Sequence, residues 1–173
     1  MSFNLKAVAA TAALLCSAAV QAEGAYIGGV FGVMNTDVGD ESPLNAGFRG
    51  GYTWNSGWGI EAEFTGSVVD GELVDFGYDP FRGRVDRGTV DYSISTQAVY
   101  ATYRTQGDIY FKGRFGYLNE EVDVKSFGNG SDSGASVGVG AGFNLVENIS
   151  FEAEYTLIEE EVDYWSGSLV VRF

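Results

Sequence analysis

Two pairs of glutamates are the residues of this chain whose spacing could do chemistry. The stretches Ile60-Glu61-Ala62-Glu63-Phe64 and Phe151-Glu152-Ala153-Glu154-Tyr155 each place two carboxylates two residues apart among apolar neighbours. Paired carboxylates can serve as general acid and general base in hydrolysis. However, the chain contains no histidine, and its single cysteine, Cys16, lies near the N-terminus, so a serine or cysteine nucleophile would lack the usual imidazole base. These features predict a structural role for the glutamates and a protein that is not an enzyme.

The N-terminal segment predicts export from the cytoplasm. Lys6 precedes an uncharged run over residues 7–20, and Val20-Gln21-Ala22 then places small residues at the two positions that signal peptidase reads. A lipoprotein anchor at Cys16 is disfavoured, because Leu15 stands where a small residue would be needed. We therefore expect a signal peptide over residues 1–22 and one domain over residues 23–173.

Composition excludes several classes of partner for this domain. Without Lys6 the chain keeps 9 of its 10 basic residues against 24 acidic ones, a net charge of −15, which repels nucleic acid. No cysteine remains after residue 22, so no disulfide is expected. Aromatic residues make up 14% of the chain, which favours a folded protein over a disordered one.

The elements that position the glutamates are alternating apolar and polar segments, which are typical of β-strands. Tilted strands of about 9 to 11 residues cross a bilayer, and short turns at one end with longer loops at the other are the layout of a bacterial outer-membrane barrel. The pattern predicts an all-β fold, an eight-stranded antiparallel up-and-down transmembrane β-barrel. The eight expected strands are residues 25–34, 45–54, 57–69, 89–103, 108–118, 135–145, 149–158 and 163–173, with short turns at 55–56, 105–107 and 146–148 and longer connections at 35–44, 70–88, 119–134 and 159–162.

Residue volume assigns the two faces of these strands. The apolar faces carry many aromatic side chains, which would overfill the interior of an eight-stranded barrel. The opposite faces are rich in glycine and serine, which relieve crowding in a lumen. We therefore expect the polar faces to line the lumen and the apolar faces to contact lipid. The first and fourth expected strands are mixed on both faces, and their orientation stays open.

The polar faces hold four carboxylates and four cations, and buried charges survive only when they are paired. The expected lumen charge network consists of Arg49, Glu61, Glu63, Lys112, Arg114, Glu152, Glu154 and Arg172. Arg49 lies on a strand next to Glu61 and Glu63, and Arg172 on a strand next to Glu152 and Glu154.

The remaining patterns concern the surface. Trp54, Trp58 and Trp165 are expected in the interfacial aromatic girdles of a membrane barrel. Arg82, Arg84 and Arg87 could grip lipopolysaccharide phosphates, although interleaved aspartates make local salt bridges an equal interpretation. The acidic run that contains Glu159, Glu160, Glu161 and Asp163 lacks the spacing of an EF-hand, so we expect no metal site and no cofactor.

The mature chain resembles the OmpA-like family of small outer-membrane β-barrels. The resemblance is carried by the signal peptide, by both glutamate pairs and by four stretches: Ala25-Tyr26-Ile27-Gly28-Gly29, Gly47-Phe48-Arg49-Gly50-Gly51-Tyr52, Phe111-Lys112-Gly113-Arg114-Phe115-Gly116-Tyr117 and Ser168-Leu169-Val170-Val171-Arg172-Phe173. It implies an outer-membrane location, and it implies that the outer-membrane assembly machinery recognises Leu169, Val171 and Phe173. The sequence stops at Phe173 without a peptidoglycan-binding domain, so cell-wall tethering is not transferred.

Three functions are compatible with these observations. The favoured one is an integral outer-membrane barrel with a polar, plugged lumen and a structural or surface-interaction role through acidic outer loops, in contact with membrane lipid and lipopolysaccharide. A narrow passive porin-like channel is the first alternative, and a soluble periplasmic barrel that binds an apolar ligand is the second. The sequence does not identify the surface ligand.

Overall fold

The computed structural model describes residues 24–36, 42–79, 83–124, 128–158 and 162–173. The expected signal peptide, Arg82 and the acidic run over residues 159–161 lie outside these ranges. Within them, no helix is long and apolar enough to cross a membrane.

The described residues form nine β-strands that share one antiparallel sheet. The strands are β1 (Ala25–Thr36), β2 (Leu44–Thr53), β3 (Trp58–Val69), β4 (Gly71–Asp79), β5 (Gly83–Arg104), β6 (Ile109–Val124), β7 (Gly128–Val146), β8 (Ile149–Ile158) and β9 (Val162–Arg172).

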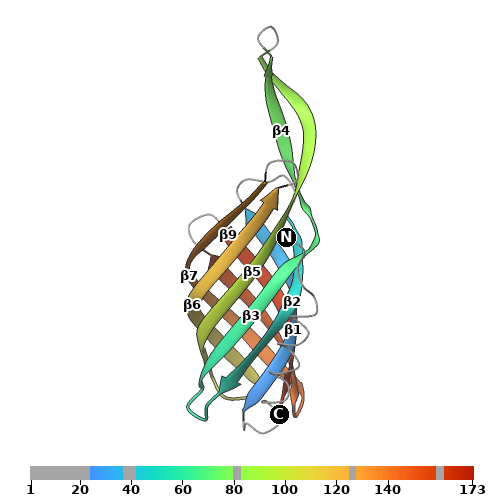
Figure 1. Cartoon of the computed structure of the whole chain (residues 1–173). Helices are drawn as coiled ribbons and strands as arrows, with labels where there is room; N and C mark the ends of the chain where they lie inside the picture. The colour runs from blue at the N-terminus through green and yellow to red at the C-terminus, as the bar shows by residue number, and fades with distance from the viewer. Residues whose placement is uncertain (1–23, 37–41, 80–82, 125–127, 159–161) are drawn as a thin grey trace, which may run out of the picture.

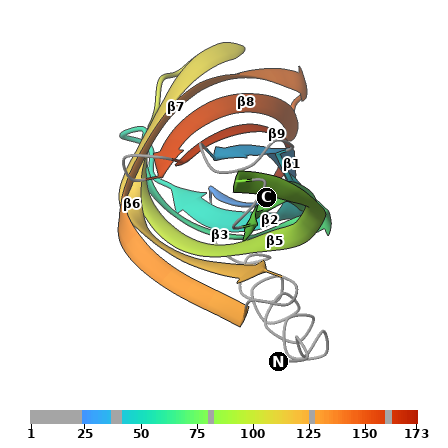
Figure 2. The same ribbon diagram turned by 90° about the horizontal axis from the view of Figure 1, so that it is seen from above.

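Eight of these strands close into a barrel. Consecutive neighbours pair from β5 through β6, β7, β8 and β9, then through β1 and β2 to β3, and β3 pairs back to β5. Figure 2 shows the resulting closed wall from above. The predicted eight-stranded antiparallel barrel is therefore confirmed. We call the end with the three short turns the turn end, and the opposite end the loop end.

The ninth strand, β4, forms a hairpin that rises above the loop end (Figure 1). It pairs only with the outer part of β5, from Gly71 opposite Tyr92 to Asp79 opposite Gly83. Residues 70–88, expected as a longer connection between two barrel strands, therefore contain a hairpin. Most of residues 119–134, also expected as a connection, belong to strands, because β6 and β7 continue pairing as far as Val124 and Gly128. An antiparallel ladder satisfies backbone hydrogen bonds that a loop would leave to water.

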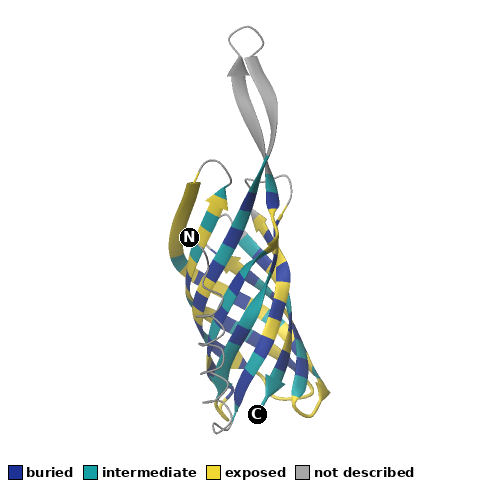
Figure 3. Ribbon diagram, turned by 45° about the vertical axis from the view of Figure 1, so that its right-hand side comes forward, coloured by how far each residue is buried: buried dark blue, intermediate teal, exposed yellow. Residues whose placement is uncertain are grey.

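Side chains alternate between the lumen and the outer wall, as the period of two requires (Figure 3). In β6, Tyr110, Lys112 and Arg114 are buried, whereas Phe111 and Phe115 are 68% and 58% exposed. The faces predicted for the strands that carry the glutamate pairs are confirmed. Most of the exposed large apolar side chains lie on the outer wall, an arrangement suited to lipid contact.

The two strands whose faces stayed open line the lumen with apolar side chains near the loop end. Met34 from β1 is fully buried, and Ile94 from β5 is 1% exposed; Tyr164 from β9, a strand whose faces were assigned, joins them at 1% exposure. The whole apolar layer consists of Val30, Met34, Tyr92, Ile94, Ala98, Tyr100, Leu118, Ile158 and Tyr164. The expected polar lumen therefore describes only the half of the barrel nearer the turn end.

Candidate functional site

The polar half of the lumen contains a charged cluster that four strands build. β2 supplies Arg49, β3 supplies Glu61 and Glu63, β6 supplies Lys112 and Arg114, and β8 supplies Glu152 and Glu154. Each pair on one strand is two residues apart, so both members point inward. We call these seven residues the ionic layer.

Glycines on β7, which separates β6 from β8, make space for the ionic layer. A Cβ atom at Gly140 would lie 2.5 Å from the carbonyl oxygen of Ala153 and 2.6 Å from Cγ of Glu154. A Cβ atom at Gly138 would lie 3.0 Å from Cγ of Arg114. The inward glycines of β7 therefore allow the long side chains of β6 and β8 to meet across it.

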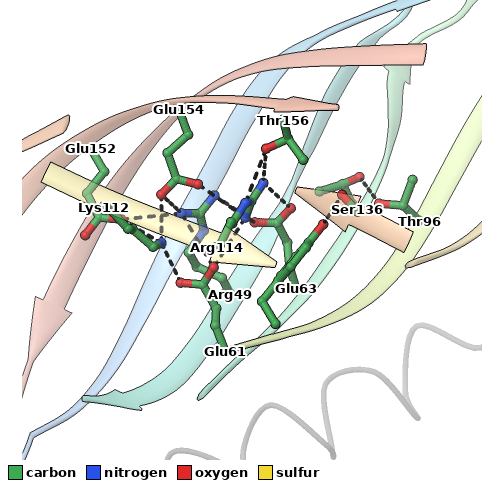
Figure 4. Close-up of polar contacts among 12 residues, drawn as sticks. Arg49, Glu61, Glu63, Thr96, Lys112, Arg114, Ser136, Glu152, Glu154 and Thr156 are labelled. Atoms are coloured by element: carbon green, nitrogen blue, oxygen red, sulfur yellow. Dashed lines mark hydrogen bonds and ion pairs between the residues drawn. The ribbon is translucent and has the colours of Figure 1, made fainter. Parts of the chain in front are cut away.

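Arg49 connects the two walls of the barrel (Figure 4). Its Nη2 lies 2.7 Å from Oε2 of Glu63 on the neighbouring strand, in register with it. Its Nη1 lies 2.7 Å from Oε1 of Glu154 on β8. Arg49 is 0% exposed, so both ion pairs are shielded from water.

Lys112 and Arg114 make the complementary connection from β6. Lys112 Nζ lies 2.7 Å from both Glu61 Oε2 and Glu154 Oε1, and 3.1 Å from Glu152 Oε2. Arg114 Nη1 lies 2.8 Å from Glu63 Oε2, and its Nη2 donates a hydrogen bond to Thr156 Oγ1 at 2.6 Å. The ionic layer is therefore one network in which every member contacts at least one residue from a non-adjacent strand.

Three further residues extend this network, and the sequence analysis did not identify them. Arg104 Nη2 lies 2.8 Å from Glu152 Oε1, Tyr26 donates a hydrogen bond to Glu61 Oε2 at 2.7 Å, and Tyr110 donates one to Glu152 Oε1 at 2.6 Å. Arg104 has the inward parity of Thr102 and Tyr100, but the expected strand ended at residue 103. A strand one residue longer would have revealed the fifth lumen cation.

Arg172 differs from the expectation. Its Nη1 donates to Asn144 Oδ1 at 3.1 Å and its Nη2 donates to the Tyr110 hydroxyl at 2.9 Å. No ion pair joins it to Glu152 or Glu154 among the contacts of the described residues. The structure therefore brings seven of the eight expected charges together and places Arg172 beside them at the turn end.

The family model named outer membrane protein beta-barrel domain matches residues 7–173. The chain belongs to this family. It is an outer-membrane β-barrel protein, and no curated protein sequence matches it.

Solved structures of outer-membrane proteins share the fold of this barrel. Neisserial surface protein A matches with a TM-score of 0.58 at 14% identity, over 87% of this chain and 98% of that one. The N-terminal β-barrel domain of Pseudomonas aeruginosa OprF matches with a TM-score of 0.56 at 14% identity, over 88% and 100%. Yersinia pestis Ail, in complex with the heparin analogue sucrose octasulfate, matches with a TM-score of 0.51 at 19% identity, over 86% and 97%. Identities this low support the fold alone.

The three tryptophans of this outer-membrane barrel lie on its outer wall. Trp54 and Trp58 flank a tight turn at the turn end, where the Trp54 amide donates to the Trp58 carbonyl at 2.7 Å and Gly57 has φ of +86°. Trp165 lies toward the loop end, with its ring centroid 4.7 Å from that of Tyr155. The side chains of Trp54, Trp58 and Trp165 are 47%, 50% and 59% exposed. Their membership in two interfacial girdles stays a prediction.

The expected assembly residues occupy the outward row of the last strand. Leu169 and Phe173 are 48% and 52% exposed, and Val171 lies between them with intermediate exposure. Leu169 is in register with Phe151 on β8 and Gly29 on β1. Recognition of this row by the assembly machinery stays a prediction. In the described part of the chain, no group of three or more acidic, histidine or cysteine residues is placed to hold a metal ion.

Proposed function

We propose that this outer-membrane barrel has a closed lumen and acts as a structural or surface-interaction protein without enzymatic activity. The observation that carries the proposal is the ionic layer, which joins β2 and β3 to β6 and β8 through the interior of the barrel. A permeant ion would have to displace charges that contact one another at 2.7 to 2.8 Å.

The apolar layer is a second observation that supports a closed lumen. It lies nearer the loop end than the ionic layer does. An eight-stranded barrel has an interior that side chains can fill, and here Met34, Ile94 and Tyr164 are almost fully buried inside it. Water and ions enter a packed apolar layer only at high cost in free energy. A solute would therefore meet an apolar seal and an ionic seal in series.

Because side chains fill the proposed closed lumen, other molecules can contact the protein only through its outer surface. The apolar outer wall is suited to membrane lipid and the lipid part of lipopolysaccharide, and the β4–β5 hairpin extends above the barrel, where it can meet surface partners (Figure 1). A polyanion such as the ligand in the Ail structure is disfavoured, because this chain carries a net charge of −14. The soluble ligand-binding barrel is disfavoured by the same apolar outer wall.

A narrow channel is the second candidate, and one observation favours it. The hydroxyls of Ser166 and Ser168 on β9 are buried without a hydrogen-bond partner in the described part of the chain. Unpaired hydroxyls along one inner wall could hold a file of water.

Conductance in planar bilayers separates the two candidates. The unmodified purified barrel should give no steady ion current, and Arg114→Ala should raise the current by removing three ion pairs of the ionic layer. Phe115→Leu, a neighbouring change on the outer wall, is the matched control and should leave the baseline unchanged. A reproducible current through the unmodified protein would establish the channel instead.

A further inference from the structure

The lumen layer at the turn end contains a cation whose donors are not all used. Arg104 is 5% exposed, and its Nη2 contacts Glu152, but its Nε and Nη1 have no hydrogen-bond partner among the described residues. Thr102, two residues before it on the same inward face, is 0% exposed, and its hydroxyl also lacks a partner. Buried unpaired donors are costly and are usually explained by a bound water or ion.

Two aromatic rings hold the Arg104 guanidinium in place. Its Cζ atom lies 4.4 Å from the ring centroid of Tyr26 and 5.7 Å from that of Tyr110. The hydroxyls of both tyrosines are already committed to Glu61 and Glu152. The rings therefore cover the guanidinium and provide no acceptor for its free N–H groups.

The numbers of cations and carboxylates in this part of the lumen indicate what kind of ligand Arg104 could bind. Between the apolar layer and the turn end, the described lumen residues include five cations, namely Arg49, Arg104, Lys112, Arg114 and Arg172, but only four carboxylates, namely Glu61, Glu63, Glu152 and Glu154. Each carboxylate is already shared by two or more cations. One positive charge is therefore left over at the turn end, where the buried Arg104 and the partly exposed Arg172 lie 5.7 and 5.2 Å from the centroid of the same Tyr110 ring.

We propose that Arg104 binds one small monovalent anion, of the size and charge of chloride, inside the barrel at the turn end. Arg104 Nε and Nη1 and the Thr102 hydroxyl donate to it, and it neutralises the excess positive charge. A bound water would satisfy the donors but would leave that charge uncompensated.

A crystal structure of the full mature chain grown or soaked with bromide tests the site directly. We expect an anomalous bromide peak within hydrogen-bond distance of Arg104 and Thr102, and no peak there in Arg104→Gln. A water or no density at this position, or bromide only on the outer surface as an adventitious ion, would overturn the proposal.

Anion-dependent stability provides an independent test in solution. The urea unfolding equilibrium of the barrel in lipid vesicles is measured in sodium chloride and in sodium gluconate at equal ionic strength. At a chloride concentration ten times the dissociation constant, the unfolding constant of the unmodified protein should fall about tenfold relative to gluconate, because the anion binds only the folded state.

Two threonine variants on the same strand make the stability test specific. Thr102→Val removes one proposed donor without changing shape or charge, and should reduce the chloride effect. Thr96→Val removes a buried hydroxyl near the loop end, where it contacts Thr65 at 2.7 Å, and should leave the chloride effect unchanged. An equal chloride effect in Thr102→Val and the unmodified protein, or the same loss in both variants, would refute the assignment. These variants also keep the test valid if Arg104→Gln fails to fold.

Discussion

The pairing of Arg49 with Glu63 gives the most direct quantitative test of the ionic layer. Arg49→Met keeps much of the side-chain volume but removes the cation at 2.7 Å from Glu63 and one of the two cations at 2.7 Å from Glu154, the other being Lys112. Removing one member of a buried ion pair typically costs about 3 to 5 kcal/mol. We expect the lower part of that range, because Arg114 still contacts both glutamates at 2.8 and 3.2 Å.

A double-mutant cycle isolates the pair itself. Glu63→Leu alone should also destabilise the barrel, because it strands Arg49 and Arg114 near one another. The double variant should cost less than the sum of the two single changes, with a coupling free energy of about 0.5 to 3 kcal/mol. Arg49→Met combined with Phe115→Leu, a change on the outer wall of β6, is the control and should be additive to within about 0.5 kcal/mol.

The free energy of unfolding for this cycle is measured by urea titration of the barrel in lipid vesicles, with tryptophan fluorescence as the signal. Trp54, Trp58 and Trp165 lie on the outer wall and report transfer from lipid to water. Additive costs for Arg49→Met and Glu63→Leu, or a neutral Arg49→Met, would show that these charges are not paired in the folded barrel.

Three further outcomes follow from the layers of the barrel. Ala62→Arg, on the outer face of β3 opposite Gly50, should lower the free energy of unfolding by about 2 to 4 kcal/mol at mid-membrane, whereas Ala62→Leu should not; a neutral arginine would reverse the face assignment. Met34→Ala should cost about 2 to 5 kcal/mol by urea titration, and a cost near zero would mean that the loop-end lumen is not a packed core. Deletion of Phe173 should reduce the amount of folded barrel in the outer membrane, measured by heat-modifiable gel migration, and normal levels would contradict its role as an assembly signal.

Much of the fold was predictable because six of the eight expected strands alternate clearly. In β3 the pattern Ile60, Ala62 and Phe64 against Glu61 and Glu63 leaves one choice of outer face once lipid is the solvent. Turn positions were predictable for a similar local reason, since Gly57 adopts positive φ between two strands. Closure then required only an even number of strands of sufficient length.

The apolar layer was not predictable, because most of its residues belong to β1 and β5, which carry apolar residues on both faces. β5 directs Ile94 and Tyr100 inward and Val99 outward, so period alone gives no preference. Their orientation is fixed by register with β6, where Tyr100 lies opposite Gly116, and register is a property of the pair of strands. Arg104 was missed for a different reason, because the expected strand ended at residue 103 whereas β5 continues to Arg104.

The two lumen layers strengthen one another, and this bears on where the protein can vary. In the closed lumen that we propose, the apolar layer keeps out water from the loop end, which lowers the effective dielectric constant around the ionic layer and strengthens its ion pairs. The ionic layer in turn fixes β2 and β3 against β6 and β8, which maintains the cross-section in which Met34 and Tyr164 pack. Filling a lumen in this way constrains the chemical type and total volume of the side chains, and it constrains the identity of each residue less. This is consistent with folds that are shared at 14% to 19% sequence identity. The proposed surface interactions would then vary with the segments outside these layers, and the β4–β5 hairpin is one such segment in the described part of the chain.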